Sequence, residues 1–147
     1  MAKSEADFTI TVSRARKRFV VRSHKDAAFK PGKTAAQQMG GGGVAYVAIG
    51  ANKPEFSFTV SDGDEATRLD DFVTNPRTGK SYDDITVSWV GRRSGETTAH
   101  KFEECVAAEG GGLKTTDGEG FTSDGAFKFL MVRAQRTVNG GAPRRVA

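Results

Sequence analysis

The sequence predicts a mainly β fold with one short α-helix: an antiparallel β-sandwich or partly open barrel, with the helix flanking one edge. Two observations lead to this prediction. In residues 55–73, an alternating apolar pattern typical of a strand changes without a gap into the three-to-four-residue spacing of a helical face. Elsewhere, short alternating apolar segments recur between glycine-rich turns, without the internal repeat of a solenoid or propeller.

The 147 residues fit a single domain, residues 1–147, because most domains contain about 100–150 residues. No apolar run reaches the length of a membrane span, and no signal-peptide pattern follows Met1, so we expect a soluble protein without membrane insertion. The lone Cys105 follows Glu103 and Glu104, whose charges would raise the pKa of its thiol. A small buried side chain is therefore favoured over a nucleophile.

Residues 8–12 and 18–22 alternate and are expected to form strands, and the basic stretch between them either continues the first strand or turns it. Residues 23–43 are the least regular part of the chain and end in four glycines, residues 40–43. Because glycine runs cannot hold one conformation alone, we expect a long assembly loop here that becomes ordered against a partner surface.

Residues 44–49 are apolar and uncharged, as in a short strand, and the next strand covers residues 55–60. A helix is expected from Asp62, and Asp62 with Glu65 has the spacing of an acidic capping box. The apolar face of this helix is formed by Ala66, Leu69, Phe72 and Val73.

After the helix, residues 85–89 alternate in a strand that carries the single tryptophan, and residues 91–95 resemble a hairpin connection. Residues 97–106 fit either a strand or a helix. Residues 127–132 are expected to form a final strand that is apolar on both sides. Residues 140–147 form a basic tail with no core to join, which we expect to be mobile unless bound.

Charge is divided into blocks along the chain. The net charge is +6 in residues 1–34, −4 in residues 53–84, −2 in residues 85–119 and +4 in residues 120–147. Basic ends around an acidic middle could form a basic stripe for nucleic acid. They could equally place a basic surface of one copy against an acidic surface of the next. The opposed blocks favour the second interpretation.

No catalytic, cofactor-binding or metal-binding residue is predicted. Gly32-Lys33-Thr34 resembles the end of a phosphate-binding loop, but the first glycine of that motif would have to stand at Ala27. The two histidines, His24 and His100, lie far apart among lysines and small polar residues, so they are expected to be solvated or structural. We therefore expect neither a cofactor nor enzymatic activity.

The strongest electrostatic feature is a basic cluster near the N-terminus. Arg14, Arg16, Arg18 and Arg22 share parity, so on one continuous strand they would line one face. Such a face could meet phosphates, but the aromatic platforms that stack single strands are missing around it. An electrostatic surface between subunits is favoured.

The order of these elements resembles that of phage tail tube proteins, a subunit family shared with contractile injection systems. The matching features are the basic N-terminal strand pair, the glycine-rich segment 23–43, the strand-to-helix junction 55–73 and the tryptophan-bearing strand 85–90. The resemblance implies a β-sandwich with a flanking helix, assembled as hexameric rings whose inward strands form a continuous β-barrel around a lumen. The early loop and the termini would bridge stacked rings, and DNA would pass through the lumen during ejection.

The resemblance also implies the partners. These are other copies of the chain, a sheath if the tail is contractile, the baseplate and the terminator, in a virion tail assembled in the host cytoplasm. The alternatives are a tail terminator, completion or baseplate protein of related fold, or a small basic nucleic-acid-binding module. The expected assembly interface places acids of the helix region and cations of the N-terminal third on opposite sides. Its residues are Arg14, Arg16, Arg18, Arg22, Lys30, Lys33, Met39, Gly40, Gly41, Gly42, Gly43, Asp62, Asp64, Asp70 and Asp71.

Overall fold

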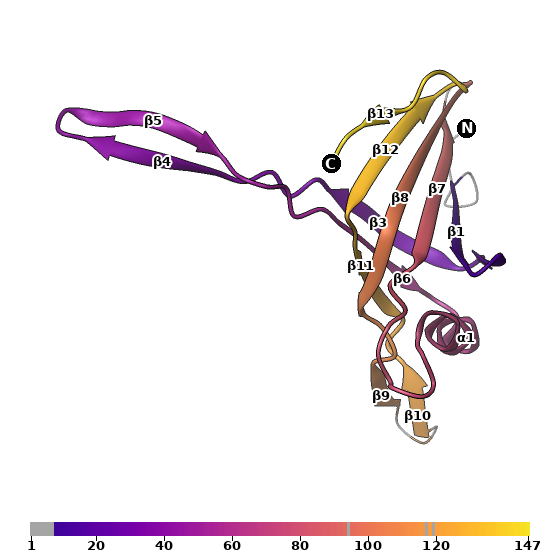
Figure 1. Cartoon of the computed structure of the whole chain (residues 1–147). Coiled ribbons are helices and arrows are strands. Elements are labelled where there is room, and N and C mark those ends of the chain that lie inside the picture. The colour runs from indigo at the N-terminus through magenta and orange to yellow at the C-terminus, as the bar shows by residue number, and fades with distance from the viewer. Residues whose placement is uncertain (1–7, 94, 117, 119) are drawn as a thin grey trace.

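The computed structural model describes residues 8–93, 95–116, 118 and 120–147 (Figure 1). The fold is mainly β with one short helix, as the sequence predicts. Its elements are β1 (Phe8–Arg14), β2 (Lys17–Val21), β3 (His24–Lys30), β4 (Ala35–Gly40), β5 (Gly43–Ile49), β6 (Glu55–Val60), α1 (Gly63–Val73), β7 (Ile85–Arg93), β8 (Glu96–Glu109), β9 (Leu113–Thr116), β10 (Gly120–Ser123), β11 (Ala126–Leu130), β12 (Arg133–Val138) and β13 (Arg144–Arg145).

Nine strands form one large sheet in the order β2-β1-β7-β8-β11-β6-β3, with β12 also paired to β8 and β13 to β12. All of its strand pairs are antiparallel. The two halves of this sheet pack face to face, because Phe56 of β6 lies 5.1 Å from Trp89 of β7 and 4.8 Å from Phe102 of β8, ring centre to ring centre. The alternating Phe56, Phe58 and Val60 all point into this core, as their period predicts.

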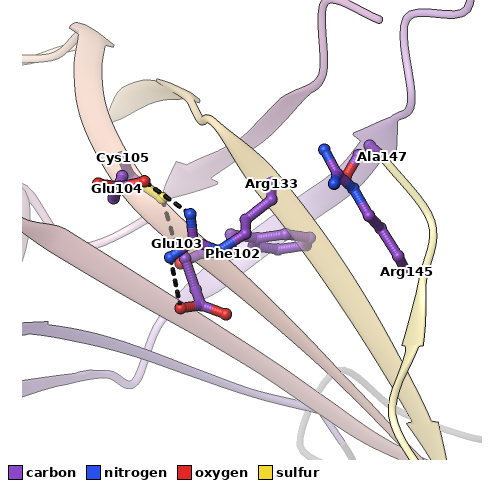
Figure 2. A network of polar contacts seen from close by, with 7 residues as sticks. All are labelled: Phe102, Glu103, Glu104, Cys105, Arg133, Arg145 and Ala147. Carbon is purple, nitrogen blue, oxygen red and sulfur yellow. Dashed lines mark hydrogen bonds and ion pairs between the residues drawn. The ribbon is translucent and has the colours of Figure 1, made fainter.

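Strand β8 joins the two halves of the sheet by bending in its middle. Its first half pairs with β7 and β12, and its last residues pair with β11. At the bend, Glu104 has a φ of +53° and the register with β7 shifts by one residue, which is a β-bulge. The Arg133 guanidinium donates to Glu104 at 2.7 Å and to Glu103 at 3.2 Å, which holds both sides of the bulge (Figure 2). The segment 97–106 is therefore a strand.

Helix α1 covers one end of the sheet. Asp62 is its N-cap and accepts a hydrogen bond from the Asp64 amide, and Ala66, Leu69 and Val73 are fully buried. The capping box expected between Asp62 and Glu65 does not form. Glu65 turns inward instead, because its carboxylate accepts hydrogen bonds from the chain between β2 and β3.

Two expectations about irregular segments are wrong. Residues 23–43 are not a loop, since β3 pairs with β6 and β4 forms a hairpin with β5. The tail 140–147 does join the core: β13 pairs with β12, and the buried Ala147 exchanges backbone hydrogen bonds with Ala134. Backbone pairing requires no apolar alternation, so these polar and glycine-rich segments carried no strand signal.

Cys105 is fully buried, as the sequence predicts, and burial raises the pKa of its thiol to about 12, with a smaller contribution from the charge of Glu103. Both histidines are structural. His24 is buried, with Nε2 3.0 Å from the Phe8 carbonyl oxygen, and the half-buried His100 ring lies 5.3 Å from that of Trp89.

Candidate assembly surfaces

The β4–β5 hairpin projects away from the body of the molecule (Figure 1). It forms a two-stranded sheet of its own, and hydrogen bonds at its base hold its two legs together. The Gly50 amide donates to the Thr34 carbonyl at 2.9 Å, the Lys53 amide to the Gly32 carbonyl at 2.9 Å, and Thr34 Oγ1 to the Ala51 carbonyl at 2.7 Å. A lone two-stranded hairpin is marginally stable in water, so this one gains most from a surface that covers it.

One face of this hairpin is open and mainly apolar, with Gln37 opposite Val47 as its polar member. By strand register, Met39, Val47 and Ile49 lie on the same face, and their exposed fractions are 66%, 56% and 90%. Residues 34–52 contain no charged side chain that would keep such a face in water. Exposed apolar surface of this kind marks an interaction site.

The tip of the hairpin is built from the four glycines. A Cβ added to Gly41, Gly42 or Gly43 would meet no atom within 4 Å, so crowding within the chain does not explain them. They make the tip narrow and leave its backbone accessible to a partner. The sequence predicts an assembly segment that contains Met39 and these glycines, but for Val47 and Ile49 it predicts only an ordinary strand.

The arginines expected to line one face do not do so. Ala15 and Arg16 adopt positive φ angles of 50° and 64° and turn the chain between β1 and β2, so the stretch is a hairpin and not one strand. Arg14 is part of the body, because its guanidinium lies 3.6 Å from the centre of the Tyr82 ring and Nε donates to the Phe72 carbonyl at 3.2 Å. Sequence spacing alone could not reveal this partner.

The remaining predicted cations are exposed. Arg16 and Arg18 belong to the β1–β2 hairpin, Arg22 follows β2, Lys30 ends β3 and Lys33 precedes the β4–β5 hairpin. Strands β2 and β3 end the strand order of the large sheet, so Arg18 and Lys30 lie on two of its edge strands. Edge strands present unpaired backbone groups to which a neighbouring chain can add.

The predicted acids gather on α1. Asp62, Asp64 and Asp71 are exposed, whereas Asp70 is half-buried and accepts a hydrogen bond from Thr74 Oγ1 at 3.2 Å. The cations and acids predicted to meet are therefore on different elements, as an interface between copies requires.

A second acidic surface appears only in the structure. A cleft of about 380 Å³ is lined by Asp83, Asp84, Thr86, Glu103 and Glu104. The first two follow the turn after α1 and the last two form the β8 bulge, so residues twenty apart in sequence contribute to one surface.

Across the residues that the structure describes, no three His, Cys, Asp or Glu side chains converge as metal ligands. The same part of the chain has no helix long and apolar enough to span a membrane.

Comparisons with known proteins return little. No family model matches the chain, and no curated protein matches it. Among solved structures, the chain is similar to Hcp1 from Flavobacterium johnsoniae, at 13% identity and a TM-score of 0.36, over 93% of this chain and 98% of that one. A similarity this low carries no argument about function, which therefore rests on the surfaces described above.

Proposed function

We propose that this chain is a structural subunit that assembles with copies of itself into stacked hexameric rings, forming the tube of a phage tail or of a related contractile injection system. In the phage setting, the subunit is assembled in the host cytoplasm and resides in the virion tail, and DNA passes through the tube without sequence-specific binding. Sheath, baseplate and terminator proteins are its further partners. The proposal assigns the chain no catalysis and no cofactor.

The observation that supports this most strongly is the uncharged β4–β5 hairpin. In a single molecule, the apolar side chains of this projecting hairpin face solvent; they are Met39, Val47 and Ile49. Burying apolar area contributes about 25 cal/mol per Å², so packing this face against another copy would favour association. A soluble monomer would gain nothing from keeping such a face.

The edges of the large sheet supply a second argument. Within the described residues, β2 and β3 each pair on one side only. If β2 of one copy adds to β3 of the next, these two edges are satisfied and the sheets continue around a closed ring. This is the geometry that an inward-facing barrel shared between subunits needs.

The separation of charges between elements supplies a third argument. The exposed cations near the edges, such as Arg18 and Lys30, and the acids of α1, such as Asp64 and Asp71, lie on different elements of one copy. Complementary surfaces of this kind set the register between subunits and exclude wrong partners.

Negative-stain microscopy of concentrated protein tests the proposal, with rings or tubes as the expected result. The double variant Val47→Ser with Ile49→Ser should raise the concentration required for assembly by on the order of tenfold or more, because it removes two apolar contacts. Val132→Ser is the matched control, since Val132 is 60% exposed on the body and not on the hairpin. Protein that stays monomeric at millimolar concentration would refute the function.

The nucleic-acid-binding alternative is supported only by the exposed cations, such as Arg16 and Arg18. It predicts a monomer that binds DNA with an affinity that falls steeply as salt is added. Tubes that form without DNA, and that survive moderate salt, would exclude it.

A further inference from the structure

An aromatic cavity opens at the end of the body where β7 turns into β8 (Figure 1). It has a volume of about 260 Å³, and its lining residues are Phe8, Trp89, Gly91, Glu96, Thr98 and His100. Cross-strand pairing brings them together, since Trp89 is opposite His100, and Gly91 is opposite both Thr98 and Phe8. The side of the sheet that faces the core thus continues into an open hollow.

Two aromatic walls of this cavity are fixed from behind by the core. The Trp89 ring lies 5.1 Å from the ring of the fully buried Phe56, and the His100 ring lies 6.1 Å from that of the fully buried Phe102, ring centre to ring centre. The Trp89 and His100 rings lie 5.3 Å from each other. A ligand would therefore meet a preformed surface and would not have to order it, which lowers the cost of binding.

The third wall depends on Gly91. The Phe8 ring lies 6.4 Å from that of Trp89, and a Cβ added to Gly91 would collide with it. The Phe8 backbone is also held, because its carbonyl oxygen lies 3.0 Å from Nε2 of the buried His24. A glycine inside a strand often marks a place where another group approaches closely, and here it leaves room for an aromatic ring.

The polar groups of the cavity define the chemistry of a fitting ligand. Thr98 and His100 are half-buried, and Glu96 is exposed at the rim. Burial, and secondarily the charge of Arg136, lower the pKa of His100, so its imidazole is neutral at pH 7. The Glu96 carboxylate only accepts hydrogen bonds. Aromatic walls with an acceptor at the rim suit an aromatic molecule that carries a hydrogen-bond donor.

The volume limits this molecule to a single ring. An apolar cavity of about 150 Å³ binds benzene, so about 260 Å³ holds a benzene ring with a small substituent. Drug-sized molecules generally occupy pockets of about 300–1,000 Å³, which this cavity does not reach.

We propose that this cavity binds a small neutral aromatic molecule of the phenol class. The ring lies against those of Phe8, Trp89 and His100, where offset and edge-to-face contacts favour it, and the hydroxyl group donates to the Glu96 carboxylate. The inference goes beyond the proposed function, because self-assembly calls only for contacts between protein chains. It adds a small-molecule site to the subunit.

The single tryptophan of the chain, Trp89, makes the occupancy of the cavity measurable by fluorescence. The full chain is titrated with phenol, and Trp89 is excited at the red edge of its absorption, where phenol and tyrosine do not absorb. We expect a saturable change in emission with a dissociation constant on the order of a millimolar or tighter. A change that only grows in proportion to the phenol concentration is non-specific quenching and would overturn the site.

Anisole tests the role of the rim, because it has the same ring as phenol but no donor. It should bind on the order of tenfold more weakly than phenol. Glu96→Gln should weaken phenol binding about threefold or more and leave anisole binding unchanged, since a neutral acceptor replaces the carboxylate. Equal affinities of the wild type for the two compounds would show that no hydroxyl group donates to Glu96.

A cavity-filling variant locates the bound molecule. Thr98→Phe should abolish the saturable response, whereas Thr97→Phe should keep it, because adjacent residues of β8 point to opposite faces of the sheet. Saturating phenol should also raise the Tm of the wild type and of Thr97→Phe but not that of Thr98→Phe, which checks at the same time that each variant is folded. Phenol binding that persists in folded Thr98→Phe would place the ligand elsewhere. Rings or tubes seen by microscopy have no bearing on these results, so the site and the proposed function can fail separately.

Discussion

Replacing Glu65 tests the packing that fixes α1 on the sheet. Glu65 is 4% exposed, and its carboxylate accepts hydrogen bonds from the Arg22 amide at 3.1 Å, the Ser23 amide at 2.9 Å and Ser23 Oγ at 2.9 Å. Ser23 Oγ in turn accepts from the Asp62 amide at 3.1 Å. One carboxylate thus ties the turn between β2 and β3 to the start of the helix.

In Glu65→Ala, two backbone N–H groups lose their acceptor. An orphaned buried donor costs about 1–3 kcal/mol, and the lost bonds are charge-assisted. We therefore expect the free energy of unfolding to fall by about 3 kcal/mol. That is a large part of the total for a domain with about 5–15 kcal/mol of stability. Glu65→Gln keeps one acceptor oxygen and should cost about half as much.

Urea unfolding followed by circular dichroism measures the difference through the transition midpoint and slope. Asp64→Ala is the matched control, because Asp64 is an exposed acid in the same helical turn. Its loss should cost about 0.3–1 kcal/mol through the helix dipole alone. If Glu65→Ala were no more destabilising than Asp64→Ala, the interpretation of Glu65 as an internal tie would be wrong.

Three further predictions follow from the body and the hairpin base. Arg14→Met should lower the free energy of unfolding by about 1–2 kcal/mol in urea titrations, because the contact with the Tyr82 ring is lost; equal stability would contradict it. Burial raises the pKa of the Cys105 thiol to about 12, so the thiol stays protonated at pH 8. A thiol reagent should therefore label Cys105 only after urea unfolds the protein, and rapid labelling of the folded protein would refute this. Gly32→Ala should disturb the hairpin base and impair assembly in sedimentation experiments, because Gly32 has a φ of +65° and an added Cβ would collide with the backbone of Lys53; assembly equal to that of the wild type would contradict this.

Part of the candidate interface could be predicted from sequence and part could not. Met39 and the four glycines stood out because an uncharged glycine run is unusual in a small domain. The sequence did not show that Arg14 belongs to the body whereas Arg18 is exposed. Tyr82, the partner of Arg14, lies far along the chain and has no effect on the local spacing of the arginines. The acidic cleft was equally hidden, since Asp83 and Glu103 come from separate elements and meet only in the folded chain.

By itself, the sequence determined the features that neighbouring residues create: the strand-to-helix junction at residues 55–73, the buried Cys105 and the mainly β class. Alternation and helical spacing are properties of consecutive side chains, so they can be read without knowing the fold. Only the tertiary structure decided the bend of β8 at Glu104, the inward turn of Glu65 and the contact of Arg14 with the Tyr82 ring. Each of these depends on groups far apart in the chain, whose meeting is set by strand pairing and packing and not by local preference.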